Sequence, residues 1–230
     1  MQIKEISYGV FPEICGLNPR FNPNSKKVKV VLDVRLPKAA GNGNLPLIFK
    51  QLTRLLPSLE KHQCGEHLLD ELKSGKSTPH LHDSGSATDI AHLMEHVMID
   101  LQSRLTGMNS CSGITCAYRS PQSRFDMFVE CRDQKVGLFT AFFAAELLSR
   151  LVKSKSLSRR YSALIDLAKY LYAKESCPPR NGRQQMGMEL DPLATQISST
   201  FNWKKSFVLP LLRTLKDFGF LNGRLPVTSR

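Results

Sequence analysis

The sequence lacks the segments that would direct a chain into or across a membrane. Its N-terminus carries charged residues on both sides of a short apolar stretch, so the hydrophobic region of a secretion signal is missing. The most apolar window, residues 136–148, is too short to span a bilayer and contains Glu146. We therefore expect a soluble, cytoplasmic protein with no membrane partner.

Paired cysteine motifs are also missing. The chain has six cysteines, and no two of them form a CxxC pair. This spacing argues against a zinc ribbon, a thioredoxin-type motif and a secreted disulfide scaffold, so we expect reduced and mostly buried thiols. Internal repeats, low-complexity segments and glycine-rich phosphate-binding motifs are absent as well, which argues against a repeat protein and a nucleotide-dependent ligase.

Acidic residues are scarce, with 20 Asp and Glu against 32 Lys and Arg and a net charge of +12 at pH 7. The imbalance is concentrated in residues 151–230, where 14 basic and 5 acidic residues give +9. A basic surplus of this kind predicts a polyanionic partner such as nucleic acid. An ordinary solvated surface is the alternative interpretation.

The pattern of apolar residues predicts an α+β fold. Strands are expected at residues 2–9, 27–35, 112–119 and 124–131, and helices at residues 46–61, 88–106 and 136–153, with a short helical or extended piece at 65–75. This order favours helices packed on one face of a largely antiparallel sheet. We expect an α+β metallohydrolase-like domain over residues 1–153 and a basic helical domain over residues 154–230.

The C-terminal region has helical periodicity at residues 159–174 and 193–202. Residues 206–221 resemble the recognition helix and exit of a winged helix-turn-helix, in which the last helix enters the major groove of DNA. Pro210 argues against this interpretation, because proline inside a helix removes a backbone hydrogen bond. A helical cap or an oligomerisation element is the alternative.

All six histidines lie between residues 62 and 96. His92, Glu95 and His96 fall on a predicted helix that ends at Gly107, and their spacing places them on one face. Two neutral imidazoles one turn apart suit Zn²⁺, and the glutamate between them can deprotonate a water at the metal. The order H-x-x-E-H is the inverted zincin motif.

A catalytic zinc site needs a third protein ligand. Glu130 is our choice, because its predicted strand can face a neighbouring helix. Cys131 points to the opposite face of that strand together with Met127 and Val129, which makes that face the core. The remaining alternatives for the third ligand are Cys116, His80 and His82, of which the two histidines lie in a polar loop.

Three separated segments resemble the N-terminal domain of cyanophycin synthetase. They are residues 56–64 (LPSLEKHQC), 92–108 (HLMEHVMIDLQSRLTGM) and 113–131 (GITCAYRSPQSRFDMFVEC), within a match over roughly residues 45–153. The resemblance implies a zinc-containing metallopeptidase-like domain, which in some family members cleaves a polymer of aspartate carrying arginine on its side chains. It also implies that His92 and His96 bind the metal, that Glu95 is the catalytic glutamate and that Glu130 is the strand carboxylate.

The sequence departs from that family in two places. Cys116 follows Thr115 where the family has arginine, which affects the choice of substrate. Residues after Lys153 resemble neither the ATP-grasp nor the Mur-ligase-like portion of the synthetase, so we expect no synthetase activity.

A substrate made of aspartate and arginine requires charges of both signs near the metal. The candidates are Asp83, Asp89 and Asp100 for guanidinium groups, and Arg104, Arg119, Arg124 and Arg132 for carboxylates. The leading hypothesis is thus a zinc-dependent hydrolase of amide or peptide bonds that acts on cyanophycin or a related Asp/Arg polymer. The alternatives are a nucleic-acid-binding regulator with a metal-binding or inactive hydrolase-like N-terminal domain, and a structural partner in a larger assembly; self-association is compatible with each.

Overall fold

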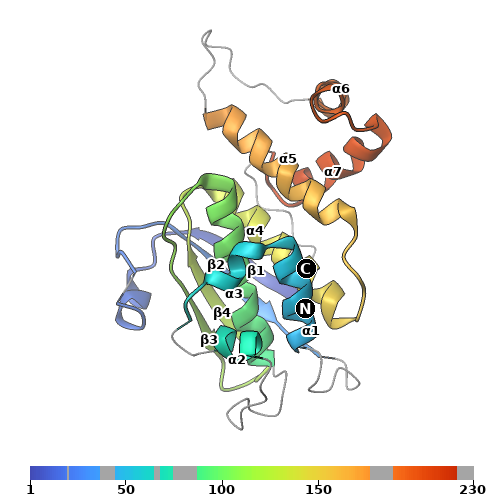
Figure 1. Ribbon diagram of the computed structural model, residues 1–230. Coiled ribbons are helices and arrows are strands. Elements are labelled where there is room, and N and C mark those ends of the chain that lie inside the picture. Colours follow the sequence, from blue (N-terminus) through green and yellow to red (C-terminus); the bar gives the residue numbers. More distant parts are fainter. Residues whose placement is uncertain (20, 37–44, 65–67, 75–86, 177–188, 222–230) are drawn as a thin grey trace.

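Helices cover one face of a four-stranded antiparallel sheet, as the sequence pattern predicts. The computed structural model describes residues 1–19, 21–36, 45–64, 68–74, 87–176 and 189–221 (Figure 1). The strands β1 (Gln2–Gly9), β2 (Lys27–Asp33), β3 (Gly113–Ala117) and β4 (Arg124–Glu130) are arranged in the order β1-β2-β4-β3. The chain is therefore α+β, with a helical C-terminal region.

Alternation along the strands separates the two faces of the sheet. In β4, Phe125, Met127 and Val129 have no exposed surface and join the main core beneath the helices. Phe128 points to the other face, where it packs with Ile14 of the 3-10 helix η1 (Pro12–Gly16) in a small separate cluster. This division decides which side chains of β4 can meet the helices.

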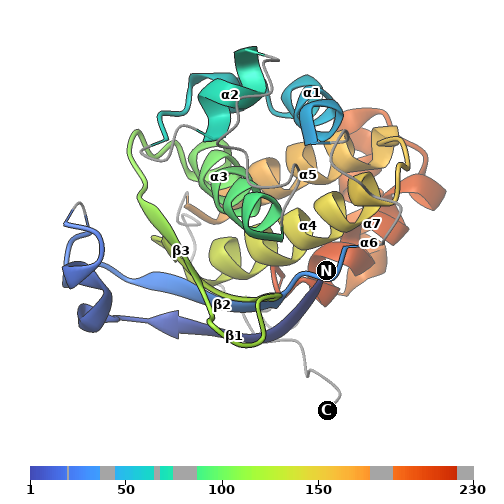
Figure 2. The same ribbon diagram turned by 90° about the horizontal axis from the view of Figure 1, so that it is seen from below.

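Two long helices lie directly on the sheet. They are α3 (Ala87–Thr106) and α4 (Gln134–Val152), and the shorter α1 (Leu45–Leu55) and α2 (Leu68–Ser74) lie outside α3 (Figure 2). Helix α3 ends as expected, because Gly107 adopts a φ of 71° and its N–H donates to Ser103 O at 2.9 Å. Helix α4 begins after Asp133, whose carboxylate accepts from Lys135 N at 3.0 Å.

The single helix expected at residues 46–61 was wrong, because the structure divides this segment into two pieces. Helix α1 ends at Leu55, and the 3-10 helix η2 (Pro57–Lys61) follows. Pro57 disfavours helical geometry at the preceding residue, and Leu56 accordingly has φ −126° and ψ 72°. The change of direction brings residues 62–64 to the side of α3.

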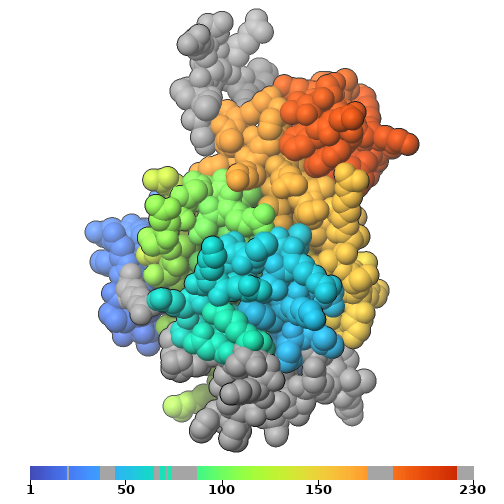
Figure 3. All heavy atoms as spheres, viewed as in Figure 1, coloured from blue at the N-terminus to red at the C-terminus, as the bar shows by residue number. Residues whose placement is uncertain are grey.

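The last three helices are α5 (Arg159–Ser176), α6 (Leu190–Phe201) and α7 (Lys205–Asp217), and α5 contacts α3. They form one end of the molecule in the space-filling view (Figure 3). One apolar cluster runs without interruption from Ile6 in β1 to Phe220. The division of the chain into two domains at residue 153 stays a prediction.

Of the described helices, none combines the length and hydrophobicity needed to cross a membrane.

Helix α7 continues through Pro210, although a proline at this position argues against a recognition helix. Pro210 is exposed, and its carbonyl accepts a hydrogen bond from Thr214 Oγ1 at 2.9 Å. The proline has no N–H to donate to the carbonyl of residue 206. The helix tolerates this loss on its exposed side, where water can solvate that carbonyl.

Candidate metal centre

Helix α3 presents His92, Glu95 and His96 on one face, as their spacing predicts. The two imidazole rings stack with centroids 5.0 Å apart and an interplanar angle of 26°. Glu95 and His96 are each 5% exposed. Burial is the main reason that the pKa of His96 falls to about 3, with the neighbouring His92 and His62 adding to the effect. His96 is therefore neutral at physiological pH, which is the state that binds metals.

Cys64 completes a group that could hold a metal ion. Its Sγ lies 3.4 Å from His92 Nε2, and the ligand atoms of Cys64, His92 and His96 all lie within 4.8 Å of one another. Cys64 was not among the ligands predicted from the sequence. The signal that could have identified it is the H-x-C pattern of residues 62–64, which lies at the edge of the histidine-rich segment.

One separation within this group matches that expected between two ligand atoms of a tetrahedral metal site. Bonds of about 2.0–2.3 Å place two ligand atoms of a tetrahedral zinc site about 3.3–3.8 Å apart. The separation of 3.4 Å between Cys64 Sγ and His92 Nε2 lies in that range. His96 Nε2 is buried and has no hydrogen-bond partner among the described residues, so it offers a lone pair. One thiolate and two imidazoles would leave the fourth position for water or substrate.

Glu95 is held beside the two histidines by strand β3. Thr115 Oγ1 donates to Glu95 Oε2 at 2.6 Å. Gly113 lies against the same carboxylate, and a Cβ at this position would be 2.6 Å from Glu95 Oε1. A side chain at residue 113 would therefore displace Glu95, so the glycine is required for this arrangement.

These groups line a pocket of about 350 Å³, a size within the range of small-molecule sites. Its wall comes from residues 17–18 after η1, residues 63–64, helix α3 and residues 111–115 at the start of β3. Asn18 fixes part of this wall, because its Nδ2 donates to Gly113 O at 3.0 Å. The lining residues are Leu17, Asn18, Gln63, Cys64, His92, Glu95, His96, Ile99, Cys111, Ser112, Gly113, Ile114 and Thr115.

The structure does not bring Glu130 to the two histidines. Glu130 alternates with the core-facing Val129, so its side chain lies on the sheet face away from α3. Its carboxylate accepts from Asn22 N at 3.2 Å, Ser25 Oγ at 2.7 Å and Ser112 N at 3.3 Å. The expectation that Glu130 faces a neighbouring helix is therefore corrected: its contacts brace two loops, and it is Cys64 that lies close to the two histidines.

The other candidates for that ligand also lie elsewhere. Cys131 belongs to the core, where its Sγ donates to Asp133 O at 2.9 Å and burial raises its pKa to about 12. Cys116 points to the opposite face of β3 from Thr115, away from Glu95. His80 and His82 lie outside the described residues, as does Asp83.

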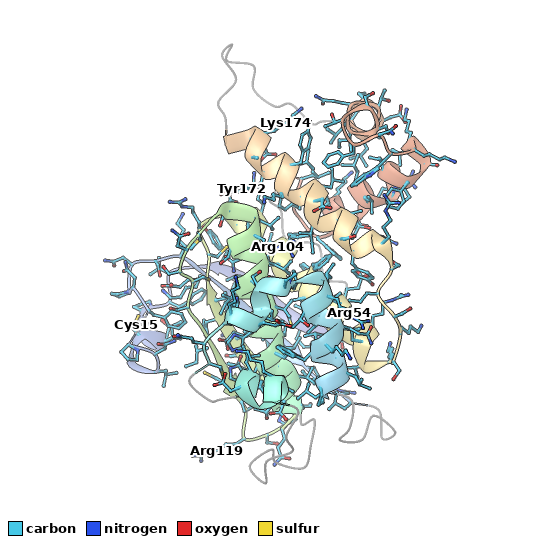
Figure 4. All side chains as sticks on the ribbon, in the orientation of Figure 1. Cys15, Arg54, Arg104, Arg119, Tyr172 and Lys174 are labelled. Atoms are coloured by element: carbon cyan, nitrogen blue, oxygen red, sulfur yellow. The ribbon has the colours of Figure 1, made fainter. Side chains whose placement is uncertain are left out.

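Two of the charges considered for substrate binding have other partners. Asp100 is 1% exposed and lies 3.2 Å from His62 Nε2. Arg104 Nη1 donates to Leu55 O at 2.8 Å and so ties α3 to the end of α1 (Figure 4). Arg119 is exposed at the turn between β3 and β4 (Figure 4). Among the described residues that line the pocket, Glu95 is the only one with a carboxylate, and none is Lys or Arg.

A polar chain leads from the metal group into the protein. His96 Nδ1 lies 3.4 Å from His62 Nδ1, and His62 Nε2 lies 3.2 Å from Asp100 Oδ1. This contact is an ion-pair distance and not a hydrogen bond, and neither oxygen of Asp100 has a hydrogen-bond partner among the described residues. A histidine that binds a metal commonly donates the N–H of its other ring nitrogen to a partner of this kind.

Comparison with known proteins assigns the chain to a family. Residues 29–153 match the cyanophycin synthase-like N-terminal domain. The matched segment begins in β2, includes Cys64, His92, Glu95 and His96, and ends just after α4. A search of curated proteins found no match. Since the match covers more than half of the chain, the protein belongs to the cyanophycin synthase-like N-terminal domain family.

Proposed function

We propose that the protein is a zinc-dependent hydrolase of amide bonds, with Glu95 as the general base. The observation that supports this proposal best is the position of Glu95 in the same pocket wall as the Cys64–His92–His96 group. Cys64, His92 and His96 would hold the ion. Bound zinc would polarise the amide carbonyl and lower the pKa of a water.

The residues of the chain supply the proton transfers. Glu95 accepts a proton from the water whose oxygen attacks the carbonyl carbon. As the C–N bond breaks, Glu95 returns that proton to the departing amine, so the products are a carboxylic acid and an amine. Thr115 donates to Glu95 Oε2 and so helps to hold the carboxylate in the pocket wall.

The proposed substrate is cyanophycin or a related polymer of aspartate and arginine, because of the family to which the chain belongs. The described pocket wall contributes no Lys or Arg, so carboxylates of such a substrate would be bound outside this pocket. Incubation with cyanophycin, unbranched polyaspartate and an unrelated protein, followed by mass spectrometry of new chain ends, tests the proposal. Cleavage of cyanophycin alone is expected; cleavage of all three would make the protein a general peptidase.

The metal assignment is tested by two cysteine variants. Cys64 and Cys111 both line the pocket, but only Cys64 belongs to the group with the two histidines. We expect about one zinc per chain in the parent, loss of that zinc in Cys64→Ala, and retention in Cys111→Ser. Elemental analysis of the purified proteins measures this. Full zinc in Cys64→Ala with none in Glu130→Gln would restore Glu130 as the ligand.

The catalytic role of Glu95 has its own test. Glu95→Gln keeps the size and hydrogen-bonding ability of the side chain but cannot accept a proton at neutral pH. We expect the variant to retain zinc and to lose hydrolysis by roughly 10²–10⁴-fold. Activity within a few-fold of the parent would show that another group is the base.

We propose DNA binding as a second candidate function, supported by the geometry of α6 and α7. The two helices pack together and are joined by residues 202–204, with Asn202 in the left-handed conformation. A short turn of this kind is typical of a helix-turn-helix. Arg213 and Lys216 are exposed on α7, one turn apart. Binding of the full chain to a duplex, weakening as salt rises, tests this function.

A further inference from the structure

His62 and Asp100 lie behind the metal group and belong to neither the proposed ligand set nor the proposed base. Asp100 follows His96 by one turn of α3, and His62 comes directly after η2. Asp100 is almost completely buried, whereas His62 retains a side-chain exposure of 17%. Burying a carboxylate costs folding free energy unless a partner compensates its charge, and His62 is placed to do so.

The proton positions along this chain follow from the atoms that meet. His62 Nε2 lies 3.2 Å from Asp100 Oδ1, and a proton on this nitrogen is what allows it to pair with a carboxylate, which can only accept. In neutral His62, Nδ1 is then an acceptor. His96 Nδ1 lies 3.4 Å from it, and with His62 Nδ1 as the acceptor the hydrogen of that contact comes from His96 Nδ1. His96 Nε2 is consequently left with a lone pair.

That lone pair is the one a metal ligand needs. His96 Nε2 is buried without a hydrogen-bond partner among the described residues, and its ring stacks on that of His92. We propose that Asp100 and His62 are positioning residues that hold His96 in the tautomer with a protonated Nδ1 and a metal-binding Nε2. The role in metal binding rests on the proposed function, whereas the tautomer itself is a property of the metal-free protein.

Residues 62–64 lie against α3 and serve both of its histidines. The same short segment supplies Cys64 to His92 and His62 to His96, so one backbone turn after Pro57 serves both histidines. Lys73 of α2 donates to His62 O at 3.2 Å and helps to hold this segment in place. Partners of this kind typically change metal affinity by about 10–100-fold when they are removed.

Nitrogen-15 NMR of the histidine rings in the metal-free protein tests the tautomer directly. We expect His96 to be protonated at Nδ1 and unprotonated at Nε2 in the parent, and to populate both tautomers in Asp100→Asn. Zn²⁺ affinity, measured by competition with a chelator, should fall by about 10–100-fold in Asp100→Asn. Asp33→Asn is the matched control, because Asp33 is also a buried, ion-paired carboxylate but lies at the end of β2.

Two variants at residue 62 separate positioning from packing. His62→Gln offers an amide N–H to Asp100 and a carbonyl oxygen to His96 Nδ1, so it should keep the tautomer and most of the affinity. His62→Leu fills similar space but offers neither a donor to Asp100 nor an acceptor to His96. It should lose both the fixed tautomer and most of the zinc affinity. Equal zinc affinity in these two variants, or a parent His96 protonated at Nε2, would overturn the proposal. The expected tautomer in a parent that binds no zinc would support the positioning role and refute only the proposed hydrolase.

Discussion

Glu95 and Gly113 constrain each other at the scale of single residues. The glutamate occupies the space that a side chain at residue 113 would need, and Thr115, two residues along β3, holds its other oxygen. Residues on β3 that alternate toward α3 thus shape the pocket, although none of them is expected to bind the metal. A glycine and a hydroxyl thus help to set the position of the carboxylate.

Gly113→Ala should therefore separate metal binding from catalysis. The added methyl group would meet Glu95 Oε1 at 2.6 Å, so the carboxylate must move while Cys64, His92 and His96 stay in place. We expect zinc content to remain near that of the parent and hydrolysis to fall by roughly 10²–10⁴-fold. Gly9→Ala, where a Cβ meets nothing within 4 Å, is the control. Parent-like hydrolysis by Gly113→Ala would contradict the proposed role of Glu95.

Asp33 gives a pH-dependent contribution to stability. Ser123 Oγ donates to its carboxylate at 2.7 Å, and this hydrogen bond, together with Arg35, lowers the pKa of Asp33 below its usual 3.8. The unfolded chain therefore binds the proton more readily, and the stabilisation is present above pH 3.8 and lost as the pH falls through the folded pKa.

Asp33→Asn should remove that contribution. The difference in unfolding free energy between parent and variant is expected to be constant above about pH 5 and to shrink as the pH falls below about 4. Urea titrations at several pH values measure it. A difference that stays the same down to pH 2 would show that the Ser123 contact does not favour the ionised form.

At the scale of whole elements, the break after α1 and the length of α3 together create the metal group. Helix α3 supplies two histidines and the glutamate at fixed spacing, while the proline at residue 57 turns the chain so that Cys64 and His62 reach the same helix. Neither element alone provides three ligands. The site therefore depends on how η2 packs on α3, and this packing requires the apolar contacts of Leu56 and Leu59, both fully buried.

Helix α7 carries the element-scale prediction for the second candidate function. If its exposed face contacts phosphates, the double variant Arg213→Ala/Lys216→Ala should bind duplex DNA more weakly and reduce the slope of log K against log salt by about 2. Lys153→Ala/Lys155→Ala removes the same charge from exposed positions between α4 and α5 and serves as the control. Equal losses in both double variants would indicate only a general effect of net charge.

At the scale of the molecule, the C-terminal helices share the core of the sheet and its helices. Phe220 packs edge-on against Phe139 of α4 with centroids 5.3 Å apart, and Tyr161 of α5 donates to Glu146 at 3.0 Å. The continuous apolar cluster predicts that the described parts unfold together.

The single tryptophan makes this testable. Trp203 lies between α6 and α7, stacked on Phe201 at 4.5 Å, so its fluorescence reports on the C-terminal helices alone. Far-UV circular dichroism reports on all helices. We expect the two signals to give the same urea midpoint. An earlier midpoint for fluorescence would show that the C-terminal helices unfold independently.

Local periodicity was sufficient to predict much of this protein. The i, i+3 and i+4 spacing places His92, Glu95 and His96 on one helix face in any packing, and strand alternation correctly assigns Met127 and Val129 to the core. The α+β class follows from the order of these patterns. These features depend on neighbouring residues, so the backbone geometry of one helix or one strand is enough to determine them.

The third member of the metal group was decided by tertiary structure. Cys64 precedes His92 by 28 residues, and Glu130 lies on a strand whose helix-facing side is its core side. The core face of β4 was predicted correctly, but the neighbouring helix was expected on the other face. Which face a helix covers, and where a chain travels after a break such as that at Pro57, depends on the burial of apolar surface over the whole molecule. That physical constraint is non-local, so no spacing within the sequence expresses it.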